Sequence, residues 1–310
     1  MNEIIRTENL SKHFGRVKAA DNISLSVRKG EIYGFLGLNG AGKTTTIRML
    51  LGMIKPTSGE SYLKGEKVTA NSHKLWNSIG YLVEIPYSYP ELTVRENLEI
   101  VRRLRLLDDS SPVDVVIEQL HLGRYQNRKA KNLSLGNAQR LGLAKAIIHK
   151  PDILILDEPA NGLDPAGIVE IRELLHDLAF NKGVTVFISS HILGEISKIA
   201  TRIGIIHEGR LIQEMDIDQL HQLRKRSLLI NVEDKNGAIS ILTKEGFNPT
   251  ITEDGFLKII SANAILHPEN VNSLLVHAGY VPNLLKVEEE DLESYFLRII
   301  GEMDVIKCGG

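Results

Sequence analysis

The sequence predicts an α/β fold over residues 1–220, followed by a small α+β domain over residues 226–310. In the first part, short apolar runs alternate with longer helical patterns, and one apolar run leads into a glycine-rich turn. The character changes at HQLRKRS (221–227), a basic, polar stretch that we interpret as a linker. The residues from 221 onward carry 9 Lys and Arg against 13 Asp and Glu, so the tail is acidic.

The first domain is expected to alternate strands with helices. The apolar strand at 31–38 ends in glycines, and helix formers with apolar spacing continue from 42 to 52. Further strands are expected at 79–83, 152–156 and 184–189, and further helices at 93–107, 136–149, 166–181 and 192–200. A hairpin at 202–215, with Glu208 and Gly209 as its turn, closes the domain.

The tail is expected to follow the order β-α-β-β-α-β plus a final helix, which fits a small ferredoxin-like domain. Strand 228–233 precedes helix 238–246, and a pair of strands surrounds the turn at 253–255. The remaining helix, strand and helix are expected at 268–280, 284–288 and 290–300.

Composition and charge exclude several classes of protein. Of the 310 residues, 43% are apolar and 25% are charged, which is typical of a globular chain with a sizeable core. The net charge of −2 argues against nucleic acid as a partner. The single cysteine, Cys308, allows no intrachain disulfide and favours a reducing compartment. No apolar run reaches the ~18–20 residues that cross a bilayer, so we expect a cytoplasmic protein whose membrane part would be another chain.

Residues 37–44, GLNGAGKT, form a phosphate-binding motif of the pattern G-x-x-x-x-G-K-[ST] between a predicted strand and a predicted helix. Its glycines let consecutive N–H groups surround an anion, and the helix N-terminus adds positive charge. Lys43 can reach the β- and γ-phosphates of a nucleotide, and the Thr44 hydroxyl can bind Mg²⁺. The candidate nucleotide-binding residues here are Asn39, Gly40, Gly42, Lys43, Thr44 and Thr45.

Asp157 and Glu158 end the apolar strand ILILDEP. Asp157 would hold Mg²⁺ beside the phosphates, and Glu158 would orient or deprotonate an attacking water. A strand that simply stops at a charged turn would also explain the two carboxylates, but the phosphate motif favours the catalytic interpretation.

Residues 133–140, LSLGNAQR, begin a predicted helix, where a serine hydroxyl and N–H groups of small residues can bind an anion. A serine that serves only as an N-cap would also explain the block taken alone, but the other motifs argue against this. The block resembles the LSGGQ signature of ABC-transporter ATPases and stands in the family's order relative to the other motifs. It retains Ser134, Gly136 and the following Gln139 and Arg140, and it departs at Leu135 and Asn137. The resemblance implies that Ser134, Gly136 and Asn137 contact nucleotide.

Further residues match this family in order. Residues 161–164, NGLD, resemble the loop that follows the catalytic glutamate and crosses the dimer interface in the family. His191 stands where the family has a histidine that contacts the γ-phosphate. Phe14 occupies the place of the aromatic that stacks on adenine, with an ordinary core position as its alternative.

Glu84, in GYLVEIP, departs from the glutamine that most of the family has at the end of this strand. In the family this loop touches Mg²⁺ or the attacking water and signals to the membrane partner. A carboxylate still accepts hydrogen bonds and binds metal, so Glu84 joins Thr44 and Asp157 as a candidate ligand. The pattern resembles the bacitracin-resistance and lantibiotic-immunity branch of ABC exporters.

The resemblance covers residues 1–220 and implies a P-loop NTPase of the ABC ATPase type, with an antiparallel β subdomain and a helical subdomain. It implies ATP and Mg²⁺ as cofactors, and a homodimer, because one chain holds one motif set. It also implies a separate membrane permease on the cytoplasmic face of a bacterial plasma membrane. The leading hypothesis is an ATPase subunit that powers export of an antimicrobial peptide.

Alternatives to this function remain open at the level of sequence. A soluble ABC protein could act on ribosomes or DNA, although the single motif set and the absence of a basic patch argue against it. An exporter ATPase could also serve a non-peptide substrate, with residues 221–310 as a ligand-sensing regulator.

Overall fold

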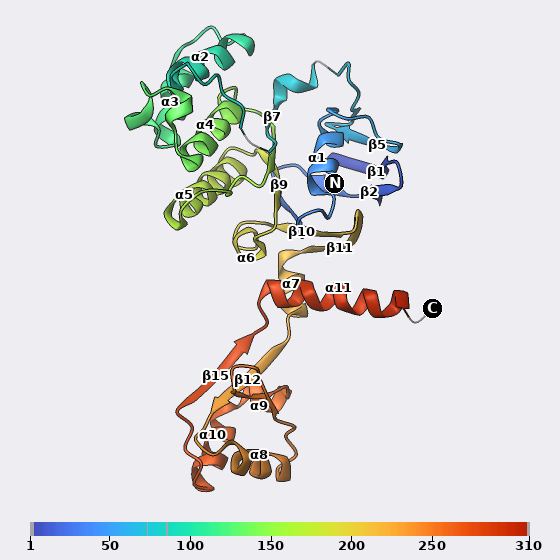
Figure 1. Cartoon of the computed structure of the whole chain (residues 1–310), viewed down its shortest axis with the longest axis vertical. Helices are drawn as coiled ribbons and strands as arrows, with labels where there is room; N and C mark the ends of the chain where they lie inside the picture. Colours follow the sequence, from blue (N-terminus) through green and yellow to red (C-terminus); the bar gives the residue numbers. More distant parts are fainter. Residues whose placement is uncertain (1–2, 73, 85, 309–310) are drawn as a thin grey trace. The chain divides into compact units, whose positions relative to one another are not determined.

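The computed structural model describes residues 3–72, 74–84 and 86–308, so Ile85 of the GYLVEIP motif lies outside the described residues. The chain divides into two compact units, Met1–Ile217 and Asp218–Gly310 (Figure 1). The stretch 221–227 is not a free linker: it holds the end of α7 (Ile217–Leu223) and the beginning of β12 (Arg226–Asn231).

A six-stranded sheet forms the centre of the first unit, in the order β11-β10-β4-β9-β8-β7. Its strands are β4 (Ile32–Leu36), β7 (Ile79–Leu82), β8 (Ile153–Asp157), β9 (Thr185–Ser190), β10 (Arg202–His207) and β11 (Arg210–Asp216). All pairs are parallel except β10 with β11, whose hairpin turn has positive φ at Glu208 and Gly209. Every residue of β4, β8 and β9 is buried, as expected for parallel strands covered on both faces. The carboxyl ends of these strands therefore meet at one edge.

A second, antiparallel sheet lies in the same unit. It comprises β1 (Glu3–Phe14), β2 (Val17–Ile23), β3 (Ser26–Arg28), β5 (Ser58–Leu63) and β6 (Glu66–Lys67). Helix α1 (Lys43–Leu50) contacts β1 and β5 of this sheet as well as β8 of the central sheet. One apolar core joins them, with members such as Leu10, Ile47 and Phe187.

Helices α2 (Val94–Leu104), α3 (Ser111–Gln119) and α4 (Leu135–Ile147) pack on one another and form the helical subdomain (Figure 1). Thr93 and Glu96 form a reciprocal capping box that starts α2. The predicted helix 166–181 is α5 (Pro165–His176) followed by a π-helical turn. The predicted helix 192–200 is wrong in extent, because α6 covers only Leu193–Ile196 before the chain turns into β10. Helix α3 was not predicted.

The second unit has a four-stranded antiparallel sheet in the order β13-β14-β12-β15. Its other elements are α8 (Lys235–Lys244), β13 (Thr250–Ile251), β14 (Leu257–Ile259), α9 (Ala262–Leu266), α10 (Pro268–His277), β15 (Leu284–Glu289) and α11 (Leu292–Cys308). This contains the predicted β-α-β-β-α-β order, with α9 as an unpredicted addition. Buried Leu228, Leu242 and Leu275 belong to a core of its own. In the part of the chain that is described, no helix has both the length and the apolar character needed to cross a membrane.

Candidate nucleotide site

The phosphate-binding loop joins β4 to α1 and encloses the Lys43 ammonium group. Lys43 Nζ donates hydrogen bonds to the carbonyl oxygens of Gly37 (2.6 Å) and Leu38 (3.2 Å), and the side chain is only 5% exposed. Gly42 has a φ of 105°, and a Cβ there would lie 2.2 Å from the Ala19 carbonyl oxygen. Only glycine fits this position, because its positive φ and its close approach to the Ala19 backbone leave no room for a Cβ.

Glu158 follows β8 and brings Lys43 and His191 together. Its Oε1 atom lies 3.2 Å from Lys43 Nζ, and its Oε2 atom lies 2.7 Å from His191 Nδ1. The backbone N–H of His191 also donates to Oε2, at 3.3 Å. Three residues that are far apart in the sequence thus meet at the carboxyl edge of the central sheet, where open α/β sheets bind ligands.

Asp157, the last residue of β8, is 3% exposed. Its Oδ2 atom accepts a hydrogen bond from Thr44 Oγ1 at 2.7 Å, and its Oδ1 atom accepts one from Ser189 Oγ at 2.5 Å. Ser189 was not predicted, because it reaches Asp157 through the register of β9 against β8, which the local sequence of neither strand shows. The candidate metal ligands Thr44 and Asp157 are therefore in contact. No cluster of three or more His, Cys, Asp or Glu side chains suited to a metal occurs among the residues that the structure describes.

Glu84, the third candidate ligand, follows β7 and has a φ of 56°. Its Oε1 atom accepts a hydrogen bond from Arg48 at 2.6 Å. Arg48 lies four residues after Thr44, on the same face of α1. This cationic partner was also missed, because nothing in the sequence near Glu84 points to α1.

The signature residues lie at the start of α4, apart from the phosphate loop. Ser134 is the N-cap of α4, and its Oγ atom accepts hydrogen bonds from Asn137 N (3.4 Å) and Asn137 Nδ2 (3.1 Å). A Cβ on Gly136 would lie 3.0 Å from the carbonyl oxygen of Gly162. Ser134, Gly136 and Asn137 line a cleft of about 570 Å³ with Gly162 and Asp164. Among the described residues, none from the phosphate-binding loop lines this cleft.

The other nucleotide-binding candidates differ in exposure. Phe14 ends β1 and is 53% exposed, with Lys12 Nζ 5.2 Å from its ring centroid, so the core alternative is wrong. Asn39 and Gly40 are exposed in the loop, and Thr45 is half-buried on α1.

The loop that follows Glu84 is tied to α4 by Lys145. Lys145 Nζ donates to the Tyr87 carbonyl oxygen (2.9 Å) and to Ser88 Oγ (2.8 Å), and burial lowers the pKa of Lys145 to about 8. Exposed apolar side chains occur here at Tyr81 on β7, at Tyr87 and Tyr89 in the loop, at Leu104 in the last turn of α2 and at Leu106 just after it.

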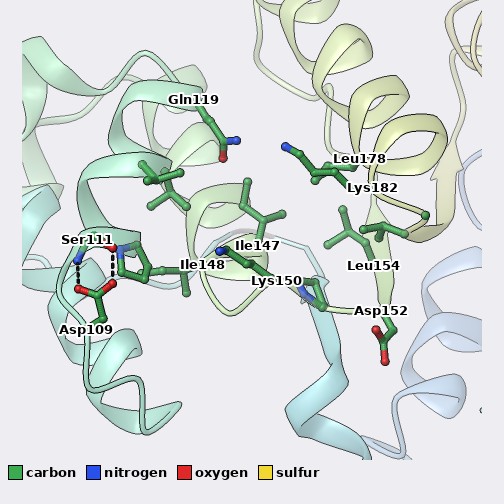
Figure 2. A pocket seen from close by; sticks show the side chains of 16 residues that line it. Asp109, Ser111, Gln119, Ile147, Ile148, Lys150, Asp152, Leu154, Leu178 and Lys182 are labelled. Carbon is green, nitrogen blue, oxygen red and sulfur yellow. Dashed lines mark hydrogen bonds between the residues drawn. The ribbon is translucent and has the colours of Figure 1, made fainter.

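A further cavity of about 540 Å³ lies at the opposite end of β8 from Asp157 and Glu158 (Figure 2). Figure 2 shows Gln119 of α3 and Lys182 at this cavity, together with apolar side chains such as Leu154 and Leu178. None of the predicted site residues is among those that line it.

The geometry defines a P-loop nucleotide site at the carboxyl edge of a parallel sheet. The family model described as "ABC transporter" matches residues 20–161. The bacitracin transport ATP-binding protein BcrA of Bacillus licheniformis is 42% identical over 97% of this chain and 98% of its own length. The lantibiotic transport ATP-binding protein SrtF of Streptococcus pyogenes is 36% identical over 72% of this chain and 95% of its own length.

Solved structures agree with these relatives. A dimeric ATP-binding cassette, MJ0796 in a post-hydrolysis state with ADP and Pi, matches with a TM-score of 0.65 and 25% identity, over 69% of this chain and 99% of that one. The chain belongs to the ATP-binding proteins of ABC transporters. It is an ABC-type ATPase that binds ATP, so the predicted family, cassette fold and enzyme class are confirmed.

Proposed function

We propose that this chain is the ATP-hydrolysing subunit of an exporter for antimicrobial peptides, with its catalytic residues at the carboxyl edge of the central sheet. The observation that carries the catalytic assignment is the joint contact of Glu158 with Lys43 (3.2 Å) and His191 (2.7 Å). With ATP bound, Lys43 exchanges its loop carbonyl partners for the β- and γ-phosphates, because charge-assisted hydrogen bonds are the stronger ones.

Glu158 then acts as the general base toward the attacking water. Its carboxylate is released from Lys43 once the ammonium turns to the phosphates, while His191 continues to hold it. A positioned base of this kind contributes ~10²–10⁴-fold to a rate. His191 adds a contact to the γ-phosphate in this proposal.

The residues present fit Mg²⁺, which prefers oxygen donors. Thr44 Oγ1 lies 2.7 Å from Asp157 Oδ2, and the Asp157 side chain is almost fully buried. These two oxygen donors would therefore both bind the ion. When bound, Mg²⁺ neutralises charge on the β- and γ-phosphates. Glu84 would join these ligands only after releasing Arg48.

The remaining proposed nucleotide contacts come from β1, from the phosphate-binding loop with the start of α1, and from the start of α4. Phe14 is proposed to stack on adenine, because its ring is half exposed and stands at the end of a strand. The loop proposed to surround the phosphates contributes Asn39, Gly40 and Gly42, and the first turn of α1 contributes Thr45. Ser134, Gly136 and Asn137 are proposed to contact the ATP held by a second copy of this chain, which makes the working unit a homodimer.

A membrane permease in a separate chain is the proposed partner. The exposed apolar side chains beside the loop after Glu84, which include Tyr87 and Leu104, support such a contact, since clusters of this kind mark protein interfaces. The chain would then sit on the cytoplasmic face of a bacterial plasma membrane. The relatives named for bacitracin and lantibiotic transport support an antimicrobial peptide as the exported substrate.

A susceptibility assay tests the function in cells. A strain that lacks this chain is complemented with the wild type or with Glu158→Gln and challenged with bacitracin, a lantibiotic and an unrelated antibiotic. We expect the wild type alone to restore resistance, and only to the peptides. Equal susceptibility of all strains to both peptides would point to another substrate.

A further inference from the structure

The peptide groups of Glu158 are held on both sides. Its N–H donates to Ser189, whose carbonyl oxygen and Oγ atom both lie at 3.2 Å. Its carbonyl oxygen accepts from the N–H of Asn161 at 3.1 Å and from Gln139 Nε2 at 3.2 Å. Glu158 has a φ of 50°, which is uncommon for a residue with a Cβ and persists only where the surroundings hold it.

Gln139 is the member of this set that comes from another subdomain. It lies on α4, whose N-cap is Ser134, and it is 5% exposed. Gln139 Nε2 is one of two donors to the Glu158 carbonyl oxygen, and its removal leaves that oxygen with only the bond from the N–H of Asn161 among the described contacts. The helix that carries the signature residues is thereby bonded to the backbone of the residue at the catalytic edge.

We infer that Gln139 is a positioning residue through which α4 holds Glu158 at the catalytic edge. This inference rests on the proposed function, in which Glu158 is the base and Ser134 contacts nucleotide. Without the amide, the Glu158 peptide relaxes from its left-handed conformation, and the carboxylate leaves its position beside Lys43 and His191. The loss affects turnover and spares ATP binding, because Gln139 touches neither the phosphate loop nor Phe14 among its described contacts.

Gln139→Met tests this role, since methionine keeps the length of the side chain and lacks the donor. Gln119→Met is the matched control, a glutamine of α3 that lines the cavity in Figure 2. We expect Gln139→Met to lower kcat about tenfold with a KM for ATP within about twofold of wild type, whereas Gln119→Met keeps both values. An unchanged kcat in a folded Gln139→Met protein would overturn the inference.

Two further measurements separate positioning from a structural role. If Gln139→Met melts early, Gln139→Asn keeps an amide that is too short to reach Glu158, and wild-type kcat in that variant would overturn the inference. In the double variant Ser134→Ala/Gln139→Met, we expect less than the product of the two single losses, because both act through α4. A full product contradicts the link through α4. A wild-type chain without ATPase activity would instead defeat the proposed function.

Discussion

The two groups of candidate nucleotide contacts are built in opposite ways. At the carboxyl edge of the central sheet, Lys43 and Asp157 are 5% and 3% exposed, and each has a partner from a distant part of the chain: Lys43 pairs with Glu158, and Asp157 accepts a hydrogen bond from Thr44. At the start of α4, the Ser134 side chain bonds to Asn137 within the same helical turn, and Leu135 is 58% exposed. The first group is assembled by one chain. The second is an open surface, which the proposed homodimer would cover.

Lys43→Ala should have the largest effect, because it removes the one ammonium at the centre of the assembled group. We expect ATP affinity to fall roughly 100-fold or more and turnover to become unmeasurable, with the fold intact. Calorimetric titration with ATP measures this, and Lys182→Ala, at the cavity of Figure 2, is the control. Wild-type affinity in Lys43→Ala would contradict the assignment.

Glu158→Gln should separate chemistry from binding. An amide cannot take a proton from water, so we expect hydrolysis to fall by ~10²–10⁴-fold while ATP still binds and keeps the dimer closed. Steady-state ATPase assays and gel filtration in ATP measure the two properties. An active Glu158→Gln enzyme together with an inactive Glu84→Gln enzyme would reverse the roles of these carboxylates.

Ser134→Ala probes the open group. We expect hydrolysis to fall about tenfold while ATP affinity of the single chain is kept, because one hydrogen bond to the second nucleotide is lost. Loss of the N-cap also costs about 1 kcal/mol of stability. Thr93→Ala, which removes the N-cap of α2, should cost similar stability and keep ATPase activity. If both variants lost activity equally, the effect at Ser134 would be one of helix stability.

Glu84→Gln should have a small effect on the isolated chain. The pair with Arg48 is solvent-exposed, with side-chain exposures of 40% and 54%, and such pairs contribute about 0–1 kcal/mol. We expect ATPase activity within about threefold of wild type and a changed response to the permease. A loss as large as that of Glu158→Gln would make Glu84 part of the chemistry.

A truncation after Leu223 should change the nucleotide site least. The second unit has its own core, and a separate domain can be removed without unfolding its neighbour. We expect the truncated chain to be soluble, to bind ATP with wild-type affinity, and to melt at the temperature at which the first unit melts in the full chain. Insoluble protein would show that the two units fold as one. Lost resistance with retained ATPase activity would give the tail a coupling or regulatory role.

The local structure of a motif could be predicted from the sequence wherever it is formed by consecutive residues. The loop around Lys43, the strand end at Asp157 and the N-cap at Ser134 each consist of consecutive residues with a fixed local geometry. The turn at Glu208 was recognisable for the same reason. Helix α3 and the short extent of α6 were not, since packing against neighbouring elements decides such segments more than their own propensity.

The sequence by itself determined the class of the protein and the candidate phosphate-binding loop, because a strand, a glycine-rich turn and a helix form that loop locally. Only the tertiary structure decided which residues contact the carboxylates proposed for metal binding and catalysis. Ser189 reaches Asp157 through the register of β9 against β8, and Arg48 reaches Glu84 across from α1. Gln139 reaches Glu158 from α4. Contacts of this kind depend on the packing of elements far apart in the chain, which no local pattern records.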